Sequence, residues 1–402
     1  MIQTTLSDIS QCLTDSVIDK AFKQKTSSQD SVKIIEVTRA APAGEGLLSA
    51  VYRIHVTGHQ HSATFIVKGL VNNLILRDTL QCTKYFAREG IFFTDILPAL
   101  IEVQKSSGAK ECIQDYTPKH YSTCLDGKND YILIEDLSER DCVSVSEYPT
   151  ESERNKVLKA LAHLHAVSIA LRIKKPEVFQ EIVKKIPELY YSEGNRDWYS
   201  PYQMNAVDLD REVLREYFEP SSIYYKKFDE IVTNDLYGTV IATLASSVEN
   251  PVLCHGDAWC PNFLCSKDKA VAIDFQLFRC ASLATDLTYL IMMCSNLCKE
   301  KQDFLDAVQI YYNDLVYFLR DMGLEASEVY TRATLDEEIK KYGRFGFMAC
   351  LTSIPLMAGE RFDVVTSVVE KVPGKERLPL ENLWKLAPIK DEHKIRVNNR
   401  YN

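Results

Sequence analysis

The feature that most constrains the fold is a change of sequence pattern near residue 150. Before it, residues 32–68 contain three runs rich in β-branched and aromatic residues, SVKIIEVTRA, SAVYRIHVTG and SATFIVKGL, which are typical of consecutive strands. After it, nearly every segment has helical periodicity, except short strands expected near 252–254 and 270–274. A chain of 402 residues is long enough for two packed parts. The sequence therefore predicts a strand-rich front part and a larger, helical back part.

Two long helices can be placed from their patterns. Residues 78–97 are expected to form a helix that ends near Pro98. Residues 147–173 have a strong apolar period of 3.6 residues, and Thr150 or Ser152 is the expected N-cap.

Composition and charge exclude several classes of protein. A net charge of −9 argues against broad nucleic-acid binding, which normally needs a basic face. The apolar runs near 287–294 and 345–358 are too short or too interrupted to span a membrane. The amino-terminal residues are polar, so no signal peptide is evident, and the twelve cysteines are expected to be reduced thiols. We therefore expect a cytoplasmic protein.

The run VLCHGDAWCPNFL, followed shortly by AVAIDF, carries the clearest chemical pattern. It places His255, Asp257 and Asn262 in the form H-x-D-x-x-x-x-N, with Asp274 twelve residues later. Phosphoryl transfer needs a carboxylate that accepts or orients the proton of the attacking hydroxyl. It also needs oxygen ligands that hold Mg²⁺ against the nucleotide phosphates. Asp257 is thus the expected catalytic base, Asn262 and Asp274 are the expected metal ligands, and His255 is expected to support catalysis by bracing the loop.

Two other interpretations of this run stay open. Asp and Asn favour turns in any protein, so these residues could be ordinary loop residues. The second alternative is a zinc site, with the ligands Cys254, His255, Cys260 and Cys265. No CxxC pair or second His-rich arm accompanies that set. The offsets of Asn262 and Asp274 favour phosphoryl transfer over both alternatives.

The strand-rich front part contains candidates for a nucleotide site. Gly44, Gly46 and Ser49 lie in a turn whose backbone N–H groups could face phosphates, although a plain hairpin turn would look the same. Lys68 ends an apolar strand and Glu89 lies on the following helix. If they pair, the lysine is positioned for the α- and β-phosphates. Read singly, they could be a lysine at a sheet edge and a solvated glutamate.

Residues 131–137 form an apolar run that stops at two acids. Such a strand could connect two lobes, and the backbone near Glu135 and Leu137 could then bind an adenine edge. Each of these elements is a weak signal when it is taken alone. Their order along the chain is more specific than any one of them.

Seven segments together resemble the ecdysteroid kinase-like (CHK kinase-like) family: GEGLLSAVYR, FIVKGL, FAREGIFFTDILP, YILIEDLS, LAHLHAVSIAL, VLCHGDAWCPNFL and AIDFQLFRCASLATDLTYLI. That family belongs to the choline kinase and aminoglycoside phosphotransferase branch of the protein-kinase-like fold. The resemblance covers about residues 40–360, and Gln276 suits the small-molecule branch, because a protein kinase carries Gly there. Leu47, Ala258 and Cys260 depart from commoner family residues, and none of these departures removes a catalytic group.

The resemblance implies an α+β, bilobal, protein-kinase-like fold. Residues 1–137 would be the nucleotide-binding lobe with an N-terminal helical extension, and residues 138–402 the helical lobe with the catalytic loop and acceptor pocket. Asp286 matches a position that helps to hold the catalytic loop, and His165 and Ser168 match a helix that packs beneath it.

The resemblance also implies ATP- and Mg²⁺-dependent phosphorylation of a hydroxyl on a small organic acceptor, such as an ecdysteroid, a related steroid or a xenobiotic. The alternatives are a kinase of choline or ethanolamine type, which acts on an amino alcohol, and a catalytically silent kinase-fold binding protein. A protein kinase is disfavoured, because an apolar helix follows Asp286 at once and leaves little room for an activation segment. Residues 188–203 and 342–362 are candidate acceptor walls. An aromatic cage for a choline-type acceptor could come from Tyr190, Tyr191, Trp198, Tyr199 and Tyr202.

Overall fold

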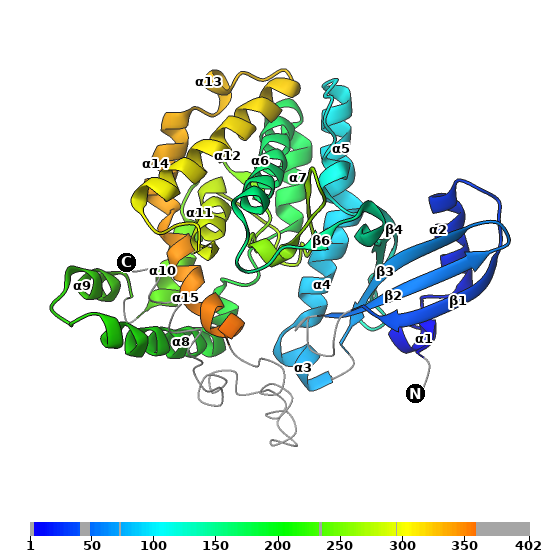
Figure 1. Cartoon of the computed structure of the whole chain (residues 1–402), viewed down its shortest axis with the longest axis horizontal. Coiled ribbons are helices and arrows are strands. Elements are labelled where there is room, and N and C mark those ends of the chain that lie inside the picture. Colours follow the sequence, from blue (N-terminus) through cyan, green and yellow to red (C-terminus); the bar gives the residue numbers. More distant parts are fainter. Residues whose placement is uncertain (1–3, 41–48, 72–73, 233–234, 295, 359–402) are drawn as a thin grey trace.

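The front part of the molecule is a five-stranded antiparallel sheet with strand order β1-β2-β3-β5-β4 (Figure 1). The computed structural model describes residues 4–40, 49–71, 74–232, 235–294 and 296–358. The strands of the sheet are β1 (Val32–Arg39), β2 (Ser49–Gly58), β3 (Ser62–Leu70), β4 (His120–Cys124) and β5 (Tyr131–Glu135). The three consecutive strands expected from the sequence are confirmed as β1 to β3.

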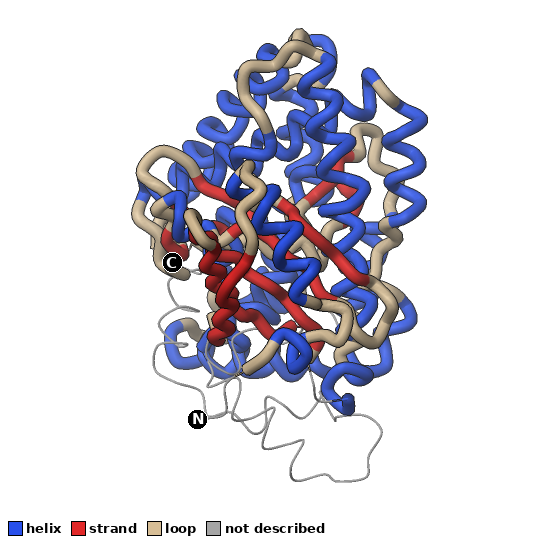
Figure 2. Tube along the Cα trace, turned by 90° about the vertical axis from the view of Figure 1, so that its right-hand side faces the viewer, coloured by secondary structure: helices blue, strands red, loops and turns tan. Residues whose placement is uncertain are grey.

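The helices α1 (Leu6–Ile9), α2 (Asp15–Thr26) and α4 (Cys82–Ile91) pack against this sheet (Figure 2). α3 (Leu74–Thr79) packs against α4, and α5 (Leu97–Ser106) packs against the second part of the molecule. Phe65 and Val67 of β3 share an apolar cluster with α1 and α2, whereas Ile66 and Leu70 belong to the cluster that includes α4 and α5. Successive residues of a strand point to opposite faces. Lys68 therefore lies on the face that α4 covers.

The helix expected over residues 78–97 is longer and less regular than the sequence predicted. It begins as α4 at Cys82, passes through a π-helical turn η1 (Phe92–Ile96), and continues as α5 to Ser106. The predicted end near Pro98 is wrong. This proline stands in the first turn of α5, where its missing N–H removes no hydrogen bond within that helix.

Helices make up most of the second part of the molecule (Figure 1). They are α6 (Glu151–Lys174), α7 (Pro176–Lys185), α8 (Arg196–Tyr217), α9 (Ile223–Ile231), α10 (Leu236–Ala245), α11 (Leu283–Met293), α12 (Lys301–Asp321), α13 (Ala326–Val329), α14 (Arg332–Tyr342) and α15 (Arg344–Ala358). Thr150 is the N-cap of α6, since its side chain accepts the N–H of Glu153. From residue 160 to residue 171 every side chain of α6 is buried, so this helix forms the core of the second part. Among the helices that the structure describes, none is long and apolar enough to cross a membrane.

Five short strands form two small sheets and frame two loops. They are β6 (Val143–Ser144), β7 (Val252–Cys254), β8 (Phe263–Cys265), β9 (Ala270–Ala272) and β10 (Arg279–Ala281). β8 pairs with β6 and β9, and β10 pairs with β7. The expected strands near 252–254 and 270–274 are confirmed as β7 and β9. The loop 255–262 joins β7 to β8, and the loop 273–278 joins β9 to β10. Because β7 pairs with β10 and β8 pairs with β9, both loops connect the same two small sheets.

Candidate active site

Lys68 is the centre of a charged group that joins a strand, a helix and a loop. Its Nζ atom lies 2.8 and 3.0 Å from the two carboxylate oxygens of Glu89 on α4. The same atom lies 3.3 Å from Oδ1 of Asp274, which follows β9. The side chain of Glu89 is 1% exposed and that of Asp274 is 36% exposed. Glu89 is thus a buried partner of Lys68 rather than a solvated glutamate. Asp274 is the member of this group whose carboxylate solvent can reach.

The charge of Lys68 is fixed by these neighbours. Burial alone would lower the pKa of Lys68, because an ammonium group is poorly solvated inside a protein. The carboxylates of Asp274 and Glu89 outweigh burial and raise the pKa of Lys68 above its usual value. Lys68 is therefore a cation at physiological pH, and an ammonium of this kind can bind phosphate oxygens as a point charge.

The loop 255–262 begins with a turn that only glycine fits. Gly256 has a φ of +87°, and a Cβ atom at this residue would lie 1.8 Å from the carbonyl oxygen of Leu277. The backbone of the loop 273–278 therefore packs directly against the backbone of the loop 255–262. This contact fixes the position of Asp257, the next residue, relative to Asp274.

The side chain of Asn262 holds the carboxylate of Asp257. Its Nδ2 atom donates to Oδ2 of Asp257 at 2.8 Å and to the carbonyl oxygen of the same residue at 2.9 Å. With the amide nitrogen used in this way, the amide oxygen of Asn262 remains for a ligand. Asp274 has a φ of +65°, and its carboxylate is partly exposed beside Lys68. An amide oxygen and a carboxylate are ligands that Mg²⁺ accepts, so these residues fit a magnesium ion.

Asp257 is partly exposed, and its charge acts on two tyrosines of the second part. Burial, strengthened by the negative charge of Asp274, raises the pKa of Asp257 to about 6. Burial, together with the charge of Asp257, also raises the pKa of Tyr199 and of Tyr289. The carboxylate is thus a stronger base than an ordinary aspartate.

His255 is fully buried and links the two loops. Its backbone N–H donates to Oδ2 of Asp286 at 2.6 Å. Its Nε2 atom lies 3.0 Å from the carbonyl oxygen of Ile273, and its Nδ1 atom accepts the backbone N–H of Asp257 at 3.3 Å. This arrangement requires the neutral ring with its proton on Nε2, and burial favours that form by lowering the pKa of His255. The ring thereby contacts the backbone beside both acids.

Asp286, in the first turn of α11, accepts hydrogen bonds from the backbone of the same loop. Besides the bond just described, its Oδ1 atom accepts the N–H of Gly256 at 3.1 Å, and Oδ2 lies 3.3 Å from Nε2 of His165 on α6. Burial would raise the pKa of Asp286, but the hydrogen bond and charge of His165 bring it below its usual value. Ser168 of α6 accepts the N–H of Leu253 in β7 at 2.7 Å. The second part of the molecule therefore anchors both the loop and the strand that precedes it.

The predicted phosphate turn is described only at its end. Gly44 and Gly46 lie outside the described residues, so their predicted role stays a prediction. Ser49 is buried, begins β2 and pairs with Leu70 of β3. Because Leu70 is two residues from Lys68, Ser49 lies near the end of the strand that carries the lysine.

Glu135 is the last residue of β5, and Leu137 follows two residues later. The carboxylate of Glu135 is paired with the guanidinium group of Arg140 and accepts the N–H of Lys119 at 3.1 Å. Leu137 begins the short helix η3 (Leu137–Arg140) and belongs to a small apolar cluster. The other members of that cluster are Cys142 and Val271, with Leu264 and Ile273 packed against them. Since Ile273 precedes Asp274 and Leu264 follows Asn262 by two residues, this apolar patch adjoins the proposed metal ligands.

The aromatic residues expected in an acceptor wall form one cluster around α8 and α15. Its members include Tyr191, Trp198, Tyr199 and Tyr202, with Tyr190 packed against them. Arg279 places a guanidinium group in this cluster, 4.8 Å from the ring centre of Phe345 and 5.8 Å from that of Tyr191. Arg279 was not predicted as a site residue. Its one local sign is a lone cation within the apolar run QLFRCASL, and its aromatic partners are distant in sequence.

Comparisons with known proteins identify the family of the chain. The model of the ecdysteroid kinase-like family matches residues 43–324. None of the curated proteins matches the chain. Three similar solved structures are an ethanolamine kinase from Plasmodium vivax (14% identity, 72% of this chain and 72% of that chain, TM-score 0.39), choline kinase LicA from Streptococcus pneumoniae (12%, 84% and 99%, 0.37) and a choline kinase from Cryptosporidium parvum (11%, 91% and 88%, 0.44). The family match covers more than half of the chain, and the α+β, bilobal, protein-kinase-like architecture is the one expected of such a protein. The chain therefore belongs to the ecdysteroid kinase-like family, whose members are phosphotransferases of the kinase type.

Proposed function

We propose that the protein is an ATP- and Mg²⁺-dependent small-molecule kinase that transfers phosphate to a hydroxyl of an organic acceptor. The observation that carries this proposal is the meeting of Lys68, Glu89 and Asp274 within hydrogen-bonding distance. Phosphoryl transfer depends mainly on positioning and on charge stabilisation. This charged group, with Asp257 and Asn262 beside it, supplies both. We assign residues 1–137 to nucleotide binding and residues 138–402 to the catalytic loop and the acceptor.

In the proposed nucleotide site, Lys68 binds the α- and β-phosphates, and Glu89 keeps its ammonium group in place. The apolar patch beside the metal ligands supports the adenine ring, with the backbone near Glu135 and Leu137 at its edge. The N–H groups of the turn with Gly44, Gly46 and Ser49 are proposed to cover the phosphates.

Asn262 and Asp274 are proposed to hold Mg²⁺, which fits their oxygen atoms. When bound, such an ion neutralises phosphate charge and orients the phosphate chain. Hydrogen bonds and an ion pair within the protein orient both ligands before an ion binds. The hydrogen bonds to Asp257 fix the amide of Asn262, and Lys68 fixes the carboxylate of Asp274.

Asp257 is proposed to orient the acceptor hydroxyl and to take its proton. As the hydroxyl oxygen bonds to the γ-phosphorus, the bond from phosphorus to the bridging oxygen breaks, and ADP leaves with that electron pair. With a pKa near 6, Asp257 is mostly a carboxylate at pH 7 and can still accept a proton. Asn262 orients this carboxylate, and His255 and Asp286 hold the backbone beneath it.

The acceptor is proposed to be an uncharged hydroxylated molecule, such as an ecdysteroid, a related steroid or a xenobiotic. A quaternary ammonium acceptor is bound by an aromatic cage that has room for its charge. Here Arg279, which is paired with Glu188 at 3.8 Å, already lies over the rings of Tyr191 and Phe345 and so occupies faces that such a cage would offer. This observation disfavours an acceptor of the choline or ethanolamine type.

The test measures ATP consumption and product formation by the purified protein with Mg²⁺. The acceptors are ecdysteroids, plant glycosides, ethanolamine, choline, and 3,3-dimethylbutan-1-ol, the uncharged isostere of choline. We expect transfer to an uncharged acceptor, loss of transfer in Asp257→Ala and Asp274→Ala, and normal transfer in the matched control Asp268→Ala. Asp268 is an exposed acid in the neighbouring turn.

Each alternative gives a different result. Transfer to choline in preference to its isostere would show that the proposed acceptor class is wrong. Unchanged transfer in Asp257→Ala would refute the assigned catalytic role. Failure to bind ATP would identify the protein as a silent binding protein that keeps the kinase fold.

A further inference from the structure

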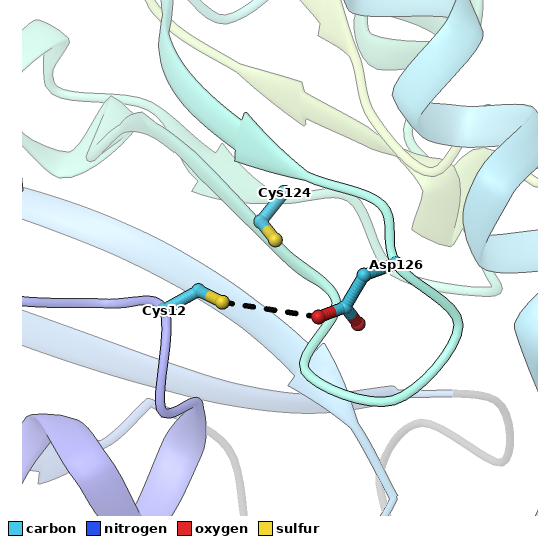
Figure 3. A group of neighbouring side chains, drawn as sticks. All are labelled: Cys12, Cys124 and Asp126. Carbon is cyan, nitrogen blue, oxygen red and sulfur yellow. Dashed lines mark hydrogen bonds between the residues drawn. The ribbon is translucent and has the colours of Figure 1, made fainter.

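A second group of potential ligands lies on the face of the sheet opposite to Lys68. Cys12 belongs to the segment between α1 and α2, Cys124 ends β4, and Asp126 lies in the turn that leads to β5 (Figure 3). Both cysteines pack at the edge of the apolar cluster that α1 and α2 form with the sheet. This group is therefore separate from the proposed phosphoryl-transfer site.

The three side chains converge on one point (Figure 3). The two sulfur atoms and a carboxylate oxygen all lie within 4.8 Å of one another, and Sγ of Cys12 is 3.8 Å from Oδ2 of Asp126. In a tetrahedral zinc site, a sulfur and an oxygen ligand are about 3.5 Å apart, and two sulfur ligands are about 3.8 Å apart. The side chains thus need to move only slightly to surround such an ion.

Hydrogen bonds that do not involve the sulfur atoms already hold these ligands. Ser10 Oγ donates to the carbonyl oxygen of Asn129 at 2.6 Å and accepts the N–H of Cys12 at 3.1 Å. Oδ1 of Asp126 accepts the N–H groups of Lys128 and Asn129 at 2.8 and 2.6 Å, and the amide of Asn129 donates to Oδ2 at 2.9 Å. Hydrogen bonds of this kind orient a ligand before the metal arrives.

We propose that Cys12, Cys124 and Asp126 bind one soft divalent cation of the zinc class, with a water molecule as fourth ligand. Two thiolates favour such an ion over Mg²⁺, which takes oxygen ligands. Binding releases the two thiol protons to solvent. The bound ion links the segment before α2 to the turn after β4, so it strengthens the attachment of the N-terminal helices to the sheet.

A disulfide is the other product that two neighbouring cysteines can form. It would require the sulfur atoms of Cys12 and Cys124 to approach to about 2.05 Å, and the carboxylate of Asp126 would take no part in it. A metal ion needs a smaller movement and uses all three ligands. The geometry therefore favours the ion.

Titration of the full chain with Co²⁺ under reducing conditions tests this site. Tetrahedral Co²⁺ with thiolate ligands gives visible bands and an ultraviolet sulfur-to-metal band. We expect the wild type to bind one Co²⁺ with this spectrum, Zn²⁺ to displace it, and Mg²⁺ to leave it unchanged. Cys12→Ser and Asp126→Asn should each weaken Co²⁺ binding at least tenfold, whereas Cys112→Ser, which changes a cysteine outside the group, should bind as the wild type does.

Thermal unfolding gives a second measurement. Zn²⁺ should raise the melting temperature of the wild type and of Cys112→Ser, but not that of Cys12→Ser, because only a ligand that binds the folded state stabilises it. Equal Co²⁺ affinity in Cys12→Ser and the wild type, or a spectrum without the sulfur band, would overturn the proposal. If one ligand variant fails to fold, the other decides between these outcomes.

Discussion

Replacement of Lys68 by methionine tests the buried charged group before any acceptor is known. Methionine keeps most of the length of the lysine side chain and removes its charge. Glu89, whose side chain is 1% exposed, then loses the cation that compensates its burial. A buried carboxylate without a partner takes up a proton instead of remaining charged. We therefore expect Glu89 to be ionised in the native wild type and neutral in native Lys68→Met.

The size of the effect follows from the pKa of glutamate in the unfolded chain. Protonation of a glutamate with a pKa of about 4.3 costs about 1.4 kcal/mol for each pH unit above that value. The cost is about 3.7 kcal/mol at pH 7 and about 1 kcal/mol at pH 5. The larger value agrees with the roughly 3–5 kcal/mol that removal of one partner from a buried ion pair costs.

The sign of the pH dependence is fixed by proton binding. Native Lys68→Met holds one proton more than its unfolded chain, so its free energy of unfolding decreases relative to the wild type as the pH rises from 5 to 8. In the wild type, the raised pKa of Lys68 gives a contribution that is fully present below the unfolded pKa of about 10.4. That contribution is lost only as the pH rises through the folded pKa, above this window. Burial also raises the pKa of Glu89 in the wild type, but the charge of Lys68 opposes this rise, so Lys68→Met should show the steeper decrease of stability with pH.

Urea unfolding at pH 5, 6, 7 and 8, followed by tryptophan fluorescence with reductant present, measures this slope. The control is the double variant Lys68→Met with Glu89→Gln, which lacks the carboxyl group and should lose stability equally at every pH. A penalty for Lys68→Met that is the same at pH 5 and pH 8 would refute the reasoning. A slope that persists in the double variant would do the same.

Two further predictions concern the loop that carries Asp257. Burial and the charge of Asp274 raise the pKa of Asp257 to about 6, so kcat/KM should fall about tenfold from pH 7 to pH 5 as this base becomes protonated, and a pH–rate profile without an acid limb would contradict the assigned role. Gly256→Ala should lower the free energy of unfolding by at least about 2 kcal/mol, because it adds a clash with Leu277 to the strain of a positive φ. The control is Gly108→Ala, at a residue with a φ of +69° and open space around it, which should cost only about 1 kcal/mol in the same denaturation assay.

The parts of the fold that repeat a period over many residues were predictable. The β-branched and aromatic residues in the runs before residue 70 predicted β1 to β3, and the helical period after residue 147 predicted α6, with Thr150 as one of two candidate caps. The three-residue strands β8 and β10 were missed, whereas β7 and β9, which are equally short, were expected because they appear as apolar runs just before His255 and Asp274. The end of the helix near Pro98 was misplaced, since a proline terminates one helix and fits the first turn of another equally well.

The candidate site likewise contains residues that a local sequence pattern indicates and residues that no local pattern indicates. The offsets between Asp257, Asn262 and Asp274 are local, so the sequence alone indicated the group that the structure brings together. Arg279 was missed because its environment is made by distant segments. Phe345, the nearer of its two aromatic partners, lies 66 residues later in the chain, and no local pattern connects them.

The hydrogen bonds from the loop to Asp286 have a consequence for the protein while it is being synthesised. Glu89 leaves the ribosome long before Asp286, and at about 5–20 residues per second the interval is roughly 10–40 seconds. During that time the first strands can already pair Lys68 with Glu89. The N–H groups of His255 and Gly256 still lack their acceptor when that loop is made, because Asp286 follows about 30 residues later. A nascent chain can therefore form the Lys68–Glu89 pair first and secure the loop that carries Asp257 only after Asp286 is made, so under the proposed function a chain that stops before Asp286 should not transfer phosphate.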